Sequence, residues 1–119
     1  VKARFILKDF LLIIMKILFI CNQNIHRSKT AEQIFSKEFD TKSAGLYNEK
    51  PVTKEQILWA DLIVVMEDEQ RSEIARRFPK EYIKKQIMSL NVPDIYHYNQ
   101  PELIKILKYK MEEVIALAN

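Results

Sequence analysis

The sequence predicts an α/β domain with a parallel sheet covered by helices on both faces. Short apolar runs at 16–21 and 60–66 lack alternating polar residues, which is typical of strands buried on both sides. Segments with apolar residues at helical spacing follow these runs. Strands that alternate with helices form parallel sheets through right-handed crossovers. Gly and Pro number only one and four in 119 residues, so we expect mostly regular structure.

The first half of the chain contains two predicted strands and two predicted helices. "KILFIC" (16–21) is expected to be a central strand, and the polar loop after it leads into an amphipathic helix over about 28–39. "TKSAG" (41–45) predicts a second short strand, which ends at the only Gly. Thr53 and Gln56 have the spacing of a capping box and predict a short helix.

The second half continues the same alternation. "ADLIVVM" (60–66) is rich in β-branched residues and predicts a buried strand. A helix should follow within 67–78, and "QIMSL" (86–90) predicts a fourth, weaker strand. After a loop, Pro101 indicates the start of the last helix. The apolar face of that helix is Leu103, Ile104, Leu107, Met111, Val114, Ile115 and Ala118.

The length favours one domain over 15–119, with residues 1–14 as an apolar N-terminal extension. Lys8 and Asp9 interrupt the apolar stretch well short of the roughly 20 residues that span a membrane, and no signal-peptide cleavage site follows. We therefore predict no membrane partner.

Met15 resembles a natural start position, which would place the extension upstream of it. If present, the extension should pack as an added strand or helix or form a homodimer interface.

The only cysteine, Cys21, excludes an internal disulfide and a Cys-paired zinc site, and it suits a reducing compartment such as the cytoplasm. Two His residues, His26 and His97, are too few to predict a metal site, so we expect neither metal nor other cofactor. The formal net charge of +3 comes from interleaved charges. It favours anionic ligands weakly and, without a basic stripe, argues against nucleic-acid binding.

The loop "CNQNIHRS" joins the end of a predicted strand to the start of a predicted helix. Backbone N–H groups of Asn22, Gln23, Asn24, Ile25 and His26 can converge there with those of the first helical turn and cradle an anion. A Cys21 thiolate facing this cradle would be stabilised by the helix dipole and by Arg27. Arg27 could also grip two oxygens of a tetrahedral oxyanion.

Asp94 lies in the loop after 86–90, at the same predicted sheet edge, and could protonate a leaving oxygen. Tyr96 and Tyr98 could line an aromatic slot beside it. The alternative is structural, since a Cys that ends an apolar strand is often a buried hydrophobe and an Asp after Pro is often a turn residue.

At these residues the chain resembles the low-molecular-weight protein tyrosine phosphatase family. That family carries Cys, five residues, Arg and Ser/Thr near its N-terminus, and a distant acid loop. The resemblance runs from about Lys16 to the C-terminus through "CNQNIHRS", "SAG", "VTKE", "ADLIVVM" and "PDIYHY". It implies a phosphotyrosine phosphatase I-like fold with a four-stranded parallel sheet and a phosphocysteine intermediate.

The resemblance also implies residue roles. Cys21 would be the nucleophile, Arg27 the phosphate clamp, and Asp94 the general acid and then base. Ser28 would hydrogen-bond to the sulfur, and Asn24, in a left-handed conformation, would shape the loop with help from Ser43. The substrate would be a phosphorylated protein, most simply at phosphotyrosine, or a small phosphate ester, and phosphate or sulfate would occupy the loop.

The sequence departs from the family at three of these positions. Gln23 replaces a usual Gly, His26 replaces a second Cys found in many members, and Ile95 replaces the Pro after the acid. The segment between "SAG" and "VTKE" is also short. The alternative function is therefore a non-enzymatic phosphate- or phosphopeptide-binding module on the same fold. An arsenate reductase would need further cysteines, and a phosphocysteine sugar-phosphotransferase component would not need Arg27 with Asp94.

Overall fold

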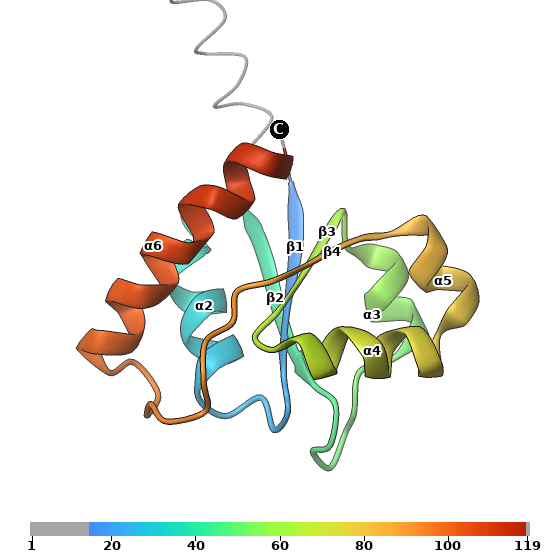
Figure 1. The fold of residues 1–119 in the computed structure, drawn as a ribbon, viewed down its shortest axis with the longest axis horizontal. Coiled ribbons are helices and arrows are strands. Elements are labelled where there is room, and N and C mark those ends of the chain that lie inside the picture. Colours follow the sequence, from blue (N-terminus) through green and yellow to red (C-terminus); the bar gives the residue numbers. More distant parts are fainter. Residues whose placement is uncertain (1–14, 119) are drawn as a thin grey trace, which may run out of the picture.

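Four parallel strands form the centre of the structure, a computed structural model that describes residues 15–118 (Figure 1). The strand order is β2-β1-β3-β4, and the predictions for residues 1–14 lie outside the described residues. The strands are β1 (Lys16–Cys21), β2 (Asp40–Gly45), β3 (Leu62–Val65) and β4 (Gln86–Ser89). The helices are α2 (Arg27–Phe35), α3 (Lys54–Trp59), α4 (Asp68–Arg77), α5 (Pro79–Lys84) and α6 (Pro101–Ala118).

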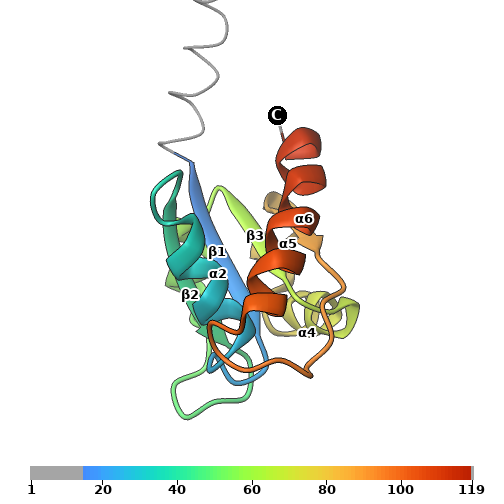
Figure 2. The ribbon, with the colours of Figure 1, turned by 90° about the vertical axis from the view of Figure 1, so that its left-hand side faces the viewer.

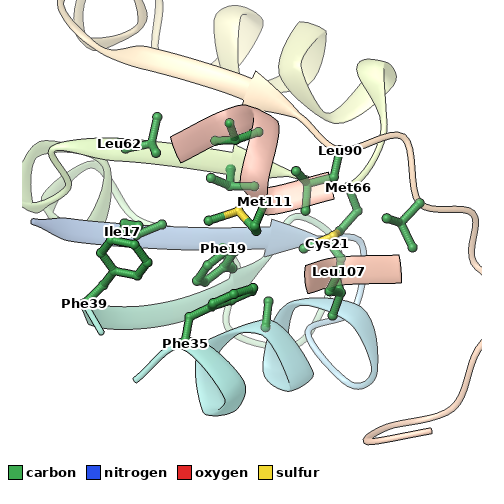
Figure 3. Packing of buried hydrophobic residues seen from close by; sticks show 14 of the residues in the cluster. Ile17, Phe19, Cys21, Phe35, Phe39, Leu62, Met66, Leu90, Leu107 and Met111 are labelled. Atoms are coloured by element: carbon green, nitrogen blue, oxygen red, sulfur yellow. The ribbon is translucent and has the colours of Figure 1, made fainter. Parts of the chain in front are cut away.

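Helices cover both faces of the sheet, as the alternation of strands and helices predicts (Figures 1 and 2). Alternate residues of β1 enter two separate cores because strand side chains point to opposite faces. Ile17, Phe19 and Cys21 pack with residues of α2 and α6, as Figure 3 shows for part of this cluster. Leu18 and Ile20 pack with residues of α3 and α4 on the opposite face. The predicted fold class is thereby confirmed.

Two helical predictions need correction. The helix expected over 28–39 ends at Phe35, because the chain turns at residues 36–38 before Phe39. Phe39 is nevertheless buried, and its ring lies 6.5 Å from that of Phe35, which is why the apolar pattern continued past the helix. Helix α5 was not predicted as a separate element; Pro79 at its first turn marks its start. Within residues 15–118, no helix combines the length and apolar character needed to cross a membrane.

The strand register brings three loops to one edge of the sheet. Cys21 at the end of β1 pairs with Gly45 at the end of β2, and Val65 at the end of β3 pairs with Ser89 of β4. The loops that follow β1, β3 and β4 therefore leave the sheet side by side, as expected for the carboxyl ends of parallel strands. These loops contain the residues that the sequence singled out.

Candidate active site

Cys21 is both a core residue and a member of a polar cluster. Its side chain is 3% exposed and packs in the α2–α6 core. Its Sγ also accepts a hydrogen bond from the Asn24 N–H at 3.2 Å and lies 2.9 Å from the Ser28 Oγ. A buried hydrophobe needs no such partners, so the surroundings of the sulfur favour a functional thiol over an apolar filler.

Asn24 shapes the turn of the loop after Cys21. Asn24 has a φ of 56°, the left-handed conformation that the resemblance implied. Its Oδ1 accepts a hydrogen bond from Ser28 Oγ at 2.6 Å. A hydroxyl has one proton, so in the thiol form the Cys21 S–H can donate to Ser28 while Ser28 donates to Asn24. In the thiolate form, Ser28 can turn its proton to the sulfur.

The N-terminus of α2 faces this loop without a side-chain cap. The N-cap residue His26 makes no capping hydrogen bond with its side chain, and the first turn of α2 has no acidic residue. By contrast, α3 has the Thr53–Gln56 capping box, and α4 carries Asp68 and Glu69 in its first turn. The first-turn amides of α2 and the positive end of its dipole thus remain for an external anion.

Arg27 lies beneath the loop with only 1% of its surface exposed. Its Nη1 donates to the Glu67 carboxylate and, at 2.8 Å, to the Val92 carbonyl oxygen. Its Nε lies 3.7 Å from Asp94 Oδ1. A buried guanidinium needs such partners, and they orient its planar fork before any ligand arrives.

A cavity of about 350 Å³ brings the predicted catalytic residues together. Asp94 is the outermost of them, with 59% of its side chain exposed. Gln23 and Ile25 come from the loop after β1, whereas Asp94 belongs to the loop after β4. The lining residues are Cys21, Gln23, Ile25, His26, Arg27, Asp94, Ile95, Tyr96 and His97.

Asn22 supports the loop instead of lining the cavity. Its Oδ1 accepts a hydrogen bond from Gln70 Nε2 at 3.0 Å, and its carbonyl oxygen accepts from Leu46 and Tyr47 N–H at 3.0 and 2.9 Å. Gln70 is buried, and its Oε1 accepts from the N–H groups of Met66 and Glu67. This glutamine therefore ties the loop after β1 to the loop after β3.

Sequence reasoning missed Glu67 and Gln70. Glu67 is the first ionisable residue after the apolar run that forms β3, and the loop after Met66 was expected at this sheet edge. Its place directly after a predicted strand, at the expected edge of the sheet, could have identified Glu67 as a site residue. The hydrogen-bond partners of Gln70 are mostly backbone groups, so no sequence pattern predicts its role.

Two expectations about neighbouring residues are wrong. The Tyr98 hydroxyl hydrogen-bonds to Gln33 of α2, and Tyr98 is not among the residues that line the cavity. Ser43 donates its hydroxyl to Glu32 Oε1 at 2.5 Å, and the side chain that holds Asn24 is Ser28. In both cases the side chain hydrogen-bonds to a polar residue of α2.

An ion-pair cluster on α4 braces the same end of the sheet. The guanidinium groups of Arg76 and Arg77 hydrogen-bond to Glu73 and lower its pKa to about 2. Arg77 also donates to the Leu46 carbonyl oxygen at 2.7 Å. Because Leu46 N–H donates to the carbonyl oxygens of Cys21 and Asn22, this cluster is linked to the loop after β1.

The two histidines lie together at the edge of the cavity. The rings of His26 and His97 are 5.6 Å apart and nearly perpendicular. Within residues 15–118, no three His, Cys, Asp or Glu side chains converge as a metal site.

Solved structures with this architecture include three phosphatases. Wzb, a tyrosine phosphatase from Escherichia coli K30 solved with phosphate, is 19% identical over 90% of this chain and 100% of that chain, with a TM-score of 0.70. SP-PTP, a low molecular weight protein tyrosine phosphatase from Streptococcus pyogenes, is 16% identical over 87% and 93%, with a TM-score of 0.72. The YwlE arginine phosphatase from Geobacillus stearothermophilus is 22% identical over 87% and 88%, with a TM-score of 0.59.

No protein-family model and no curated protein matches the sequence. The structural matches nevertheless extend over nearly the whole described chain and nearly the whole of each neighbour. The chain therefore has the fold of the low-molecular-weight protein tyrosine phosphatases, as the resemblance of its loop and strand motifs predicts.

Proposed function

We propose that the protein is a phosphatase that hydrolyses phosphomonoesters through a phosphocysteine on Cys21. The observation that carries the proposal is the position of the Cys21 Sγ in one cavity with the buried Arg27 and with Asp94. Backbone amides of the loop and of the first turn of α2 would hold the phosphate oxygens. Arg27, with Nη1 fixed on Glu67 and Val92, would offer its remaining edge to two oxygens.

The reaction has two displacement steps. The Cys21 thiolate attacks phosphorus and forms the S–P bond, while the bond from phosphorus to the ester oxygen breaks and Asp94 protonates that oxygen. Water then attacks the phosphocysteine, and the Asp94 carboxylate takes its proton. The S–P bond breaks, and inorganic phosphate and the Cys21 thiolate are released. Ser28 can stabilise the sulfur each time it carries negative charge.

The substrate class we propose is aryl phosphate, with phosphotyrosine in a protein as the natural form. Ile25 and Ile95 line the cavity and are 53% and 71% exposed, so they offer apolar walls at its mouth. Tyr96 lines the same cavity. These side chains suit the flat, apolar ring of a phenyl ester better than a short alkyl ester.

The need for a free thiolate suits a reducing compartment, so we place the activity in the cytoplasm. Inorganic phosphate should bind the same loop as product. It should raise the melting temperature, because a ligand that binds only the folded state stabilises it.

The test is hydrolysis of an aryl phosphate between pH 4.5 and 8 by the wild type, Cys21→Ser and Asp94→Ala. Cys21→Ser should abolish turnover because the hydroxyl is a far weaker nucleophile. Asp94→Ala should lower kcat by about 10² to 10⁴ because the leaving oxygen loses its proton donor. Phosphate should still raise the melting temperature of both variants, which shows that they are folded.

Absence of hydrolysis by the wild type, together with thermal protection by phosphate, would contradict the proposal. It would support the alternative of a phosphate- or phosphopeptide-binding module. Equal turnover of phosphotyrosine and phosphoserine peptides would contradict only the aryl preference.

A further inference from the structure

Backbone hydrogen bonds attach the loop that carries Asp94 on both sides of that residue, and Tyr96, between them, packs against the α2–α6 core. Near the start of the loop, Val92 is fully buried, its N–H donates to the Met66 carbonyl oxygen at 2.8 Å, and its own carbonyl oxygen accepts from Arg27. Residues 93–95, between the two attachments, are exposed. Asp94 Oδ1 lies 3.7 Å from Arg27 Nε, and the path of the loop that places it there depends on the attachments on both sides.

The second attachment is formed by α2 and its N-cap. The Tyr98 N–H donates to His26 Nδ1 at 3.0 Å, and the Asn99 N–H donates to Thr30 Oγ1 at 2.9 Å. The Tyr98 hydroxyl hydrogen-bonds to Gln33. We call His26, Thr30 and Gln33 the α2 clasp. Two of its three hydrogen bonds hold backbone amides and so fix the path of the loop itself.

We infer that His26 is a positioning residue that holds the Asp94 loop over the Cys21 cavity. His26 follows Ile25 in the anion loop and also binds the acid loop, so it joins the two parts of the proposed active site directly. The inference rests on the proposed function, in which Asp94 is the proton donor. It assigns to His26 a role through Asp94 instead of through the phosphate.

The chemistry of the imidazole defines the expected effect of substitutions. A backbone N–H can donate only to an unprotonated Nδ1, so the hydrogen bond to Tyr98 requires the tautomer that carries its proton on Nε2. An asparagine Oδ1 can replace Nδ1 as acceptor at a similar distance from the backbone. His26→Asn should therefore keep the hydrogen bond to Tyr98, whereas His26→Ala should lose it.

The first arm of the experiment is amide hydrogen exchange, which does not depend on activity. In His26→Ala, the Tyr98 amide should exchange about tenfold faster than in the wild type, because local opening no longer breaks a hydrogen bond. His26→Asn should restore most of the protection. The Val92 amide, at the first attachment, is the internal control and should be unchanged.

The second arm is the dependence of kcat/KM on the leaving group. Phenyl phosphate needs a proton on its leaving oxygen, whereas dinitrophenyl phosphate does not. His26→Ala should lower kcat/KM for phenyl phosphate about tenfold and for dinitrophenyl phosphate less than about twofold, since only proton donation is impaired. His26→Asn should recover kcat/KM for both substrates. The inhibition constant of inorganic phosphate should change less than about twofold, because the backbone N–H at position 26 is present in all three proteins.

Unchanged Tyr98 exchange in His26→Ala would overturn the inference. So would an equal loss of kcat/KM for both substrates, which would mean that His26 acts on phosphate binding. Failure of His26→Asn to recover more activity than His26→Ala would overturn it as well. If the wild type hydrolysed neither substrate, the proposed function would fail, and the exchange arm would still decide whether His26 holds the loop.

Discussion

At the scale of single residues, Asn24 combines a backbone conformation with a side-chain hydrogen bond. Its φ of 56° disfavours most residues other than Gly and Asn, and its Oδ1 accepts a hydrogen bond from Ser28. Asn24→Gly should lose only the hydrogen bond to Ser28. Asn24→Ala should lose that hydrogen bond and also destabilise the left-handed backbone conformation. We expect Asn24→Ala to be less stable than Asn24→Gly by about 1 kcal/mol in the free energy of unfolding from urea denaturation.

Asparagine in the left-handed region also occurs at Asn91 and Asn99. The same pair of substitutions at Asn91, outside the candidate site, is a matched control and should give a similar difference. Equal stability of the Gly and Ala variants at position 24 would show that the left-handed conformation is not required there.

Some residues of the candidate site could be predicted from a local sequence pattern, and others could not. The sequence predicted that Cys21, Arg27 and Asp94 share one sheet edge, and the structure places all three at one cavity. Their catalytic roles stay predictions. The support by Glu67 and the Val92 carbonyl could not be predicted, because these contacts join positions 40 and 65 residues from Arg27.

At the scale of elements, the end of β2 limits the space behind the loop after β1. A Cβ on Gly45 would lie 2.9 Å from the Asn22 carbonyl oxygen and 2.6 Å from the Asn48 Oδ1. The Asn48 side chain can move, but the Asn22 carbonyl is backbone that two N–H groups hold in place. Gly45→Ala should therefore displace the loop and weaken phosphate binding at least about tenfold, as measured by calorimetric titration.

Asn48→Ala is the matched control, because it removes one of the two crowded groups without touching the loop. It should leave phosphate affinity close to that of the wild type. The double variant should recover only part of the loss, because the contact with Asn22 remains. Full recovery would instead locate the conflict in the Asn48 side chain.

The elements themselves were predicted where the sequence pattern is long or uniform. All four strands were expected, and β1 and β3 stood out because both faces of these strands are buried. Helix α5 has six residues, too few for a helical period to show. The end of α2 was misplaced because Phe39 keeps the apolar spacing after the chain has left the helix. A pattern of apolar residues indicates burial and not helical conformation. Here Phe39 is buried although the helix has ended at Phe35.

At the scale of the whole molecule, the Glu73 cluster links α4 to the loop side of the sheet. Its guanidinium partners lower the Glu73 pKa from 4.5 to about 2, so the ionised form is favoured by folding. The resulting stability is present above pH 4.5 and is lost as the pH falls toward 2. The difference in unfolding free energy between the wild type and Glu73→Gln should shrink over this range in urea denaturation.

Glu69→Gln, on the same helix at an exposed position, is a control for removing one negative charge. It should show a smaller change across the same pH range. A difference for Glu73→Gln that stays constant from pH 7 to pH 3 would contradict a role for the ionised carboxylate. The effect is expected to be modest, because ion pairs near the surface are screened by solvent.

Because the chain has a single cysteine, a thiol reagent can modify each molecule at one known position. Every thiol in a pure sample is Cys21, and in the folded protein Cys21 lines the cavity of the candidate site. Iodoacetate alkylates Cys21 in folded and in unfolded molecules, whereas phosphate bound in the cavity would protect the thiol only in folded, binding-competent molecules. The share of protein that stays unmodified in saturating phosphate would give the competent fraction of a preparation, which converts observed turnover into turnover per functional molecule.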